Sequence, residues 1–372
     1  MKSNIDQLMK EALEDHRKGN FENAEKLYRE ILETDPTHID ANHNLGVILV
    51  ANHNSSGALT YFQCALESNE NVEQIWLSYI DALINIDELN DARQLIEAAR
   101  EKNLSHEKLD IFLERTLTPI ELHEKGKFFR AQDGRYLNFL KALHKKKYDG
   151  YFEIGTRTGA SLVLSQSPSV AIDPYFQLSE DPIGNKDFCL LFQETSDSFF
   201  QNSMSKLLNL RCQLAFIDGM HLFECALRDF INLAKISAEK SLFLFHDPIP
   251  WTYRMATRNN EKLGRNEAWT GDIWKLVHIL SEVGMKDGIK LLSSAPSGLL
   301  AVLNPEEAAI KELEKNYDYI CSKWLNVDLN RENLLSFYEV GIFEKPEIYL
   351  DHLEKSSFGC KSISHSRDWV SQ

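Results

Sequence analysis

The sequence has 372 residues, 43% hydrophobic and 26% charged, which is typical of a globular chain long enough for two or three domains. Its net charge of −15 disfavours nucleic acid and anionic membranes as partners, and no stretch approaches the ~20 apolar residues of a membrane span. The first residues lack the apolar core of a signal peptide, and the six cysteines form no CxxC pair, so we expect reduced thiols and a cytoplasmic location.

Residues 1–104 repeat themselves every 34 positions. A small residue recurs at this period and a bulky one follows it four positions later: Ala24 and Tyr28, Ala58 and Phe62, Ala92 and Ile96. This pattern resembles the tetratricopeptide repeat, a pair of antiparallel helices in which the small residue lets the helices approach. Three such repeats can stack a continuous core and imply docking of a protein partner. Residues 1–117 hold 11 Lys and Arg against 22 Asp and Glu, so their charge of 11 − 22 = −11 favours a basic or neutral partner.

The following segment, 105–147, is expected to be helical and to cap the repeats before a second domain. From Tyr148 on, short apolar runs alternate with helical stretches; the runs are 151–155, 169–173, 189–193, 214–219 and 241–247. Such runs are typical of parallel strands buried on both faces of a sheet. Two further runs, 289–294 and 298–303, predict a hairpin.

These elements predict an α + α/β fold class: a helical repeat solenoid, then a Rossmann-like doubly wound sheet with a reversed edge hairpin over residues 148–304. Residues 305–372 are expected to form a mostly helical C-terminal extension.

The loop after the first predicted strand carries two glycines in the pattern ExGxxxG, which begins at Glu153. Gly155 permits a tight turn, and Gly159 lets a following helix begin close to the strand with its N-terminus toward a ligand. The second strand ends in Asp173-Pro174, where a carboxylate can accept both hydroxyls of a ribose. The alternatives are an ordinary strand–glycine–helix turn and a turn-forming Asp-Pro pair.

In this order and spacing, the segments FEIGTRTGAS, AIDP, FIDGMHLFECALRDF and FLFHD resemble the class I S-adenosylmethionine-dependent methyltransferases. The resemblance is to the small-molecule branch whose fourth and fifth strands end in IDGxH and FHD. It implies S-adenosylmethionine as cofactor and a set of binding residues: Glu153, Gly155 and Gly159 for the methionine part, Asp173 for the ribose, Thr195 and Ser196 beside the adenine, and Asp218. The family usually has a Gly-Gly turn before the fifth strand, where this chain has Ser237-Ala238-Glu239-Lys240.

A polar cluster follows the fourth and fifth predicted strands: Asp218, His221, His246 and Asp247. Strand ends of this kind form the binding crevice of an open α/β sheet. Methyl transfer to a hydroxyl needs a base, so we expect catalytic roles for His221 or His246 and for Asp247. Alternatively, Asp218, His246 and Asp247 hold a divalent metal, and this mixed ligand set suits zinc, manganese or iron better than magnesium. A structural role for one of the two histidines is equally open.

Residues 248–270 form a long segment rich in side chains that can close over an acceptor: Trp251, Tyr253, Arg254, Arg258, Arg265 and Trp269. Aromatic faces suit a sugar ring, whereas arginines suit a phosphate or carboxylate. Asp272 is expected to cap the helix that follows, with Trp274 packed inward, and Arg228 with Asp229 to form a surface or capping pair.

We therefore expect an O-methyltransferase acting on a sugar, glycan or other small hydroxylated acceptor, docked to a protein partner by its repeats. Two alternatives stay open: a repeat scaffold with a non-catalytic methyltransferase domain, and a metal-dependent oxygen enzyme using Asp218 and Asp247.

Overall fold

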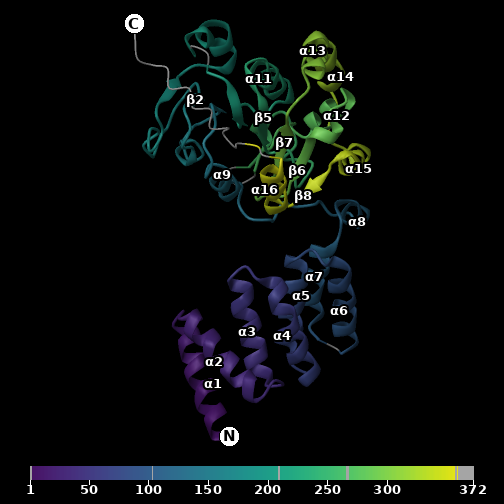
Figure 1. Cartoon of the computed structure of the whole chain (residues 1–372). Helices are drawn as coiled ribbons and strands as arrows, with labels where there is room; N and C mark the ends of the chain where they lie inside the picture. The colour runs from purple at the N-terminus through teal and green to yellow at the C-terminus, as the bar shows by residue number, and fades with distance from the viewer. Residues whose placement is uncertain (1, 103, 208–209, 265–267, 357, 359–372) are drawn as a thin grey trace, which may run out of the picture. The chain divides into compact units, whose positions relative to one another are not determined.

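The computed structural model describes residues 2–102, 104–207, 210–264, 268–356 and 358 (Figure 1). The chain divides into two compact units, Met1–Thr118 and Pro119–Gln372. Within the described ranges, no helix is both long and apolar enough to cross a lipid bilayer.

The first unit is a series of helical hairpins. Its helices are α1 (Lys2–Arg17), α2 (Phe21–Thr34), α3 (Ile39–Ala51), α4 (Ser55–Ser68), α5 (Glu73–Asn85), α6 (Leu89–Glu101) and α7 (His106–Thr116), and each packs against the next along the chain. The predicted 34-residue period is confirmed, because the small and bulky residues of α2, α4 and α6 are all buried. Gly46 shows how closely the helices approach, since a Cβ there would lie 2.5 Å from Cε1 of Phe62.

The second unit contains an eight-stranded sheet in the order β3-β2-β1-β4-β5-β7-β6-β8. The strands are β1 (Tyr151–Ile154), β2 (Ser169–Ile172), β3 (Cys189–Phe192), β4 (Cys212–Ile217), β5 (Ser237–His246), β6 (Ile289–Leu292), β7 (Leu299–Leu303) and β8 (Phe343–Glu344). The first five strands are parallel, and β7 runs antiparallel to both of its neighbours. The five predicted strands and the hairpin are thus confirmed, whereas the short β8 was not predicted.

Helices cover both faces of the central strands, as alternate side chains of one strand show. Phe152 and Ile154 of β1 join the core with α11 (Phe223–Lys235) and α12 (Lys275–Glu282). Tyr151 faces the other side, where α9 (Tyr136–Leu143) and α16 (Pro346–Lys355) pack. This double burial explains why the strands are apolar at consecutive positions rather than at alternate ones.

The remaining helices of the second unit lie around this three-layer core. They are α8 (Pro119–Glu124), the single turn α10 (Ser196–Ser198), α13 (Glu307–Lys315), α14 (Tyr317–Trp324) and α15 (Arg331–Val340). Apolar residues of α13, α14 and α15 join the same core as those of α11 and α12. Residues 359–372 of the predicted helical extension lie outside the described residues.

One predicted helix is wrong. In place of a helix after Gly159, the structure has a single 3₁₀ turn, Leu162–Leu164, before β2. Leu162 is fully buried against the sheet, and Ser165 to Pro168 then lead directly into β2. Proline and serines here disfavour helix continuation, because proline lacks a donor and serine hydroxyls bond nearby backbone groups. The segment between β2 and β3 also contains no helix.

Candidate functional site

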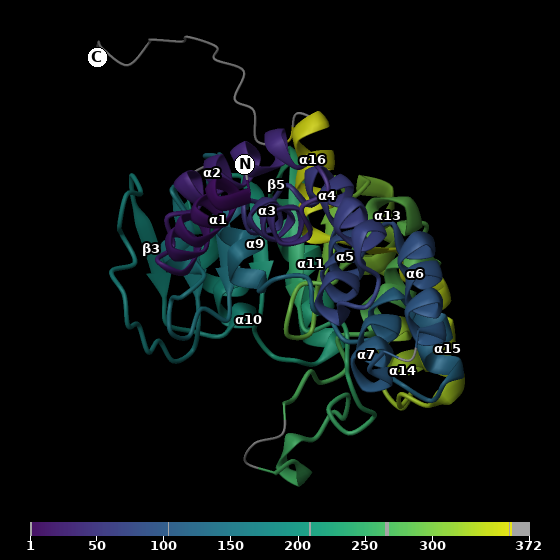
Figure 2. The same cartoon turned by 90° about the horizontal axis from the view of Figure 1, so that it is seen from below.

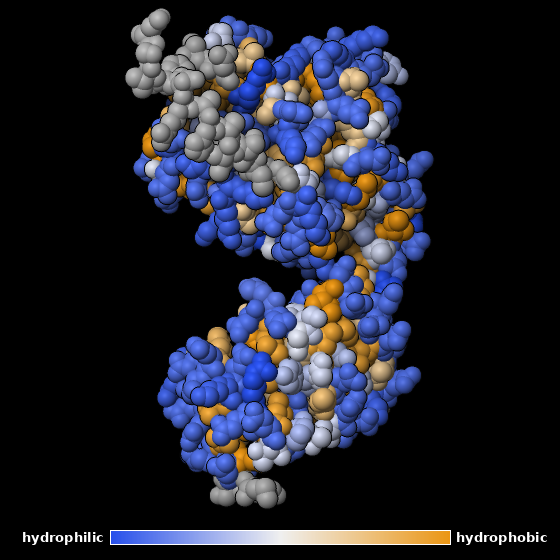
Figure 3. Space-filling model, in the orientation of Figure 1, coloured by the Kyte–Doolittle hydropathy of each residue, from blue (hydrophilic) through white to orange (hydrophobic). Residues whose placement is uncertain are grey.

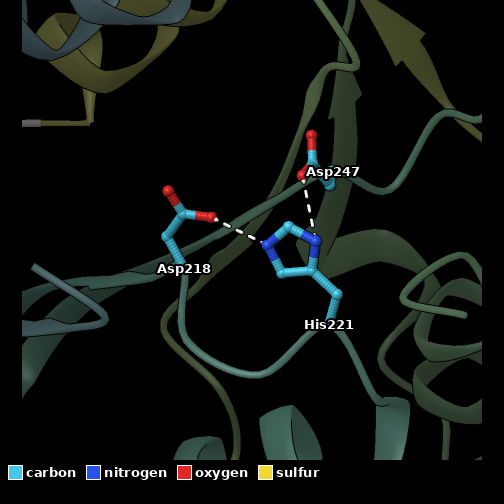
Figure 4. A group of neighbouring side chains, drawn as sticks. All are labelled: Asp218, His221 and Asp247. Atoms are coloured by element: carbon cyan, nitrogen blue, oxygen red, sulfur yellow. Dashed lines mark ion pairs between the residues drawn. The ribbon is translucent and has the colours of Figure 1, made fainter. Parts of the chain in front are cut away.

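The polar cluster predicted from sequence is assembled at the carboxyl ends of β4 and β5 (Figure 4). His221 lies between two carboxylates: its Nε2 is 3.4 Å from Asp218 Oδ1, and its Nδ1 is 3.4 Å from Asp247 Oδ2. One ligand atom from each of the three residues lies within 4.8 Å of the others, so the group has the dimensions of a metal site. The parallel pairing of β4 and β5 brings His221 and Asp247, 26 positions apart in the sequence, into contact.

Local backbone features place these side chains. Asp247 has φ of 62°, a left-handed conformation that is uncommon outside glycine and turns its carboxylate away from the path of β5. The backbone of Gly271 packs closely against the His221 backbone, since a Cβ at residue 271 would lie 1.7 Å from the His221 carbonyl oxygen. That carbonyl also accepts a hydrogen bond from the Asp272 backbone N–H at 3.1 Å.

His246, the last residue of β5, faces the same carboxylates from inside the unit. Its Nδ1 lies 3.1 Å from Asp218 Oδ1 and 3.4 Å from Asp247 Oδ1. Its Nε2 is buried and has no hydrogen-bond partner among the described residues. The ring of Tyr136, from α9, lies over the imidazole with the centroids 4.3 Å apart. His246 is therefore enclosed by protein, whereas His221 is closer to the surface.

The charges of the cluster stabilise one another. Burial acts to lower the pKa of His246, but the Asp218 and Asp247 carboxylates outweigh it and raise the pKa to about 9. Burial likewise opposes the charged form of His221, yet the hydrogen bond to Asp218 and the charge of Asp247 raise its pKa. For Asp218 the effect of burial is outweighed by the two histidines, which lower its pKa.

Trp269 covers His221 from the segment after β5. The indole and imidazole rings stack at 5.1 Å with an interplanar angle of 26°. His221 Nδ1 lies 3.0 Å from the backbone carbonyl oxygen of Trp269, so this nitrogen carries the proton and its N–H donates a hydrogen bond to the carbonyl. In the neutral ring Nε2 then carries the lone pair and faces the Asp218 carboxylate at 3.4 Å.

The glycine loop lies beside this cluster at the same edge of the sheet. Gly155 has φ of 85°, and a Cβ there would lie 2.1 Å from the Asp218 carbonyl oxygen. Gly159 also has positive φ, at 81°. Asp173 fastens the loop, because its Oδ2 accepts the Arg157 backbone N–H at 2.8 Å. Its Oδ1 accepts the Tyr175 N–H at 2.7 Å. Only glycine fits at residue 155, since the loop and the end of β4 touch through backbone atoms.

Glu153 lies beneath the loop and is fully buried. One of its oxygens accepts the Tyr151 hydroxyl, and the other accepts the Ser161 hydroxyl at 3.0 Å. Burial raises its pKa to about 7 against these two hydrogen bonds, which lower it. In this arrangement Glu153 ties β1 to the loop, and its predicted direct contact with a ligand stays a prediction.

The two residues predicted beside an adenine lie after β3. Thr195 caps α10, since its hydroxyl oxygen accepts the Ser198 N–H at 3.2 Å. Ser196 hydrogen-bonds Asp229, whose pKa burial nevertheless raises to about 7. The surface role predicted for Asp229 is wrong: it lies on the inner face of α11, while Arg228 pairs with Asp197 at 2.5 Å.

Within the segment 248–264, Ile249 and Ala256 are buried in the core, whereas the part around the 3₁₀ turn Asn260–Lys262 extends away from the body of the unit (Figure 2). The predicted closing residues have different roles within it. Trp251 donates its indole N–H to the Pro296 carbonyl at 2.8 Å, and Tyr253 packs edge-on against Phe128. Arg254 is exposed, and Arg265 lies outside the described residues.

Arg258 is engaged in ion pairs and does not face an open site. It reaches Glu224 and Asp272, each at 2.5 Å. Asp272 also accepts the Phe223 backbone N–H at 2.8 Å, so it caps α11 and not the following helix as predicted. The two helix starts meet in space, which the sequence could not indicate. Trp274 is buried as predicted.

Sequence reasoning missed two side chains of this site, Tyr136 and Ser297. The hydroxyl of Ser297 donates a hydrogen bond to Asp247 Oδ1. Both residues lie far from the cluster in sequence and belong to no motif, so only the folded chain identifies them.

Comparisons with known proteins assign no family: no family model and no curated protein matches the sequence. The structure is similar over 30% of the chain to the TPR2B domain of yeast Sti1 in complex with pHsp70, at 20% identity over 94% of that chain with a TM-score of 0.28. The Sgt2 TPR domain from Aspergillus fumigatus matches over 33% of the chain, at 19% identity over 83% of its own length with a TM-score of 0.29.

A mutant O-GlcNAc transferase of Thermobaculum terrenum matches over 58% of this chain and 46% of its own, at 13% identity with a TM-score of 0.30. Similarities of this strength identify no function. The assignment of helical repeats is supported instead by the burial of the small and bulky residues that recur every 34 positions.

Proposed function

We propose that the second unit is an S-adenosylmethionine-dependent methyltransferase that acts on a neutral hydroxylated acceptor. The observation that carries the proposal is the backbone contact of Gly155 with Asp218, which sets the glycine loop directly beside the His221 cluster. A cofactor held by the loop would thus have its reactive end at the cluster. The five parallel strands followed by the reversed strand β7 agree with the edge hairpin that the sequence resemblance favours.

The residues present fit this cofactor. Gly155, Arg157 and Gly159 all have positive φ, which shapes a concave turn above β1. Each Asp173 oxygen accepts one backbone N–H and keeps a further lone pair for a ribose hydroxyl. When bound, the cofactor supplies an electrophilic methyl group and its own sulfur leaving group.

His221 is the better base of the two histidines on geometric grounds. Its Nδ1–H is held by the Trp269 carbonyl, so Nε2 can take the proton of an acceptor hydroxyl. Asp218 then stabilises the imidazolium from 3.4 Å. His246 cannot do this, because its Nε2 is enclosed and its Nδ1 faces the carboxylates. We assign His246 the role of a fixed positive partner of Asp218 and Asp247.

The acceptor is proposed to be neutral because Arg258, one of the arginines predicted to meet an acidic group, is already paired with carboxylates of this chain. Arg258 bridges Glu224 and Asp272, so two carboxylates already balance its charge. Trp269 and Tyr136 flank the histidines with aromatic faces, which suit the apolar face of a sugar ring or a planar ring.

A metal-assisted version of the same reaction is the second candidate. The group Asp218, His221 and Asp247 differs from the predicted metal set by having His221 in place of His246. Donation of the His221 Nδ1–H to a backbone carbonyl is the arrangement common among metal-ligating histidines, whose other nitrogen binds the ion. One histidine with two carboxylates suits zinc, manganese or iron. Metal analysis of the purified protein before and after dialysis against a chelator distinguishes the two versions.

The first unit is proposed to dock a protein partner. Stacked helical hairpins present a continuous surface, and hydrophobic side chains lie among hydrophilic ones over α5 and α7 (Figure 3). Ile111 of α7 is 59% exposed. The acidic charge of these repeats favours a basic or neutral partner.

Calorimetry with S-adenosylmethionine on the full chain tests the proposal. We expect saturable binding that the demethylated product displaces, weakened at least about tenfold in Asp173→Asn, because a charge-assisted hydrogen bond to the ribose is lost. Asp187→Asn, which changes an exposed carboxylate, is the matched control and should bind normally. No heat with either ligand would refute the enzyme, whereas normal binding without turnover on sugar or phenolic acceptors would favour the non-catalytic scaffold.

A further inference from the structure

The turn between β6 and β7, residues 293–298, contacts three other parts of the second unit. On one side it holds the chain that leads into α9. The Asp133 N–H donates to the Ser293 carbonyl at 2.9 Å, and the Tyr136 N–H donates to the Ala295 carbonyl at 3.0 Å. The Ala295 N–H donates back to the Gly134 carbonyl at 2.6 Å. These bonds place the ring of Tyr136 over His246.

On its other side the turn holds the chain that leaves β5. The Ile249 N–H donates to the Ser297 carbonyl at 2.9 Å, and the Trp251 indole donates to the Pro296 carbonyl. Gly298 allows this approach, because a Cβ there would lie 2.4 Å from Cδ1 of Ile249. The turn therefore fixes both the segment after Asp247 and the start of the long segment above the site.

Ser297 makes the contact that reaches the cluster itself. Its hydroxyl donates to Asp247 Oδ1, and both side chains are nearly fully buried. With Oδ1 engaged, the other carboxylate oxygen, Oδ2, faces His221 Nδ1 at 3.4 Å. The left-handed backbone at Asp247 does not determine this rotation of the carboxylate, because χ2 of an aspartate is broad.

We infer that Ser297 is a positioning residue, which orients the Asp247 carboxylate so that Oδ2 and the Trp269 carbonyl together hold the His221 Nδ1–H. The catalytic consequence of this positioning rests on the proposed function, in which His221 is the base. Two acceptors on Nδ1 fix the ring plane and the tautomer, so that Nε2 is the nitrogen offered to an acceptor hydroxyl. Ser297 itself acts only through Asp247.

Ser294 supplies a matched control within the same turn. Its side chain is fully buried like that of Ser297, but its hydroxyl has no hydrogen-bond partner among the described residues. Ser294→Ala and Ser297→Ala remove the same atoms from the same turn, and only the second removes the contact to Asp247. A loss of turn packing should affect both variants alike.

The test is NMR of the ligand-free full chain with ¹⁵N-labelled histidine, with the His221 ring signals assigned by their loss in His221→Gln. We expect the Nδ1–H of His221 to exchange with solvent about tenfold faster in Ser297→Ala, because an orienting hydrogen bond to a charged group is lost. Ser294→Ala should exchange as the unmodified protein does. Equal rates in all three proteins, or equal acceleration in both variants, overturn the inference.

This measurement is independent of turnover and of cofactor binding. A failed inference leaves S-adenosylmethionine binding untouched, and a failed binding experiment leaves the exchange result standing. If methyl transfer is found, Ser297→Ala should lower kcat about tenfold without raising KM for the acceptor, and Ser294→Ala should change neither. A matching rise in KM would instead indicate a general loosening of the site and contradict the positioning role.

Discussion

Replacing Gly155 with alanine probes the contact that joins the glycine loop to the cluster. The new Cβ would lie 2.1 Å from the Asp218 carbonyl oxygen, 2.4 Å from its carbonyl carbon and 2.6 Å from Cα of Gly219. All three atoms belong to backbone, so no side chain can rotate to relieve the overlap. The end of β4 must move away from β1, although the Asp218 N–H bonds the Ile154 carbonyl there at 2.8 Å.

The expected loss of stability has a conformational part, from the positive φ, and a steric part, from the added volume and a disrupted hydrogen bond. A positive φ in a non-glycine residue costs about 1–2 kcal/mol. Forcing extra volume into a packed site costs about 1–3 kcal/mol, and disrupting one backbone hydrogen bond costs about 1 kcal/mol more. Gly155→Ala should therefore destabilise the sheet unit by about 3–6 kcal/mol, a large share of the ~5–15 kcal/mol typical of a domain.

Gly284→Ala separates the two parts. Gly284 has φ of 88°, close to the 85° of Gly155, but nothing lies within 4 Å of its added Cβ. It should lose only the backbone part, about 1–2 kcal/mol. Urea unfolding followed by tryptophan fluorescence measures the difference, because four tryptophans of the described residues lie in the sheet unit and one in the repeats. Equal destabilisation by the two substitutions would refute the steric argument.

Three further predictions follow from single contacts. Burial raises the pKa of Glu153 from 4.5 to about 7, so the folded state binds this proton more tightly than the unfolded state does. The free energy of unfolding should therefore fall as pH rises from 4.5 to 7, by at most about 3 kcal/mol. Glu153→Gln should remove this fall in unfolding measured at pH 5 and pH 8. A difference that is constant with pH would contradict this. Gly46→Ala should push into the ring of Phe62 and accelerate hydrogen exchange in α3 and α4, while exchange in the sheet stays unchanged. Arg258→Met should lower the free energy of unfolding by about 2–4 kcal/mol, because Glu224 and Asp272 lose a buried partner. Lys323→Met, which breaks an exposed ion pair with Glu282, should lower it by under ~1 kcal/mol. Similar losses in the two variants would show that burial of the Arg258 pairs is unimportant.

The sequence was informative wherever a structural period or a strand end carried the signal. The 34-residue recurrence from Ala24 to Ala92 predicted helical hairpins, because burial in a repeat depends on positions at one spacing. The continuous apolar runs predicted the parallel strands, because strands inside a sheet covered on both faces bury consecutive side chains. The gathering of Asp218, His221 and Asp247 followed from parallel strands that end at one sheet edge.

Sequence reasoning failed where a local pattern fits two structures equally well. A strand followed by glycine occurs before helices and before plain turns. After Gly159, the serines and Pro168 disfavour a helix, and the chain forms a 3₁₀ turn. Asp272 precedes a helix and so was predicted to cap it, yet α11 begins closer to its carboxylate.

By itself, the sequence determined which residues of the repeats and of the central strands are buried and which polar groups stand at the ends of neighbouring strands, because both depend on short spacings. It was wrong for the edge strand β3, where the predicted burial on both faces fails and Leu190 and Leu191 are exposed. Tertiary structure alone decided how those polar groups are used. His246 is enclosed, the Trp269 carbonyl accepts a hydrogen bond from His221 Nδ1–H, and Ser297 orients Asp247. All three depend on contacts between segments tens of residues apart. Such contacts leave no periodic trace in the chain, since they arise only after the sheet and its loops have come together.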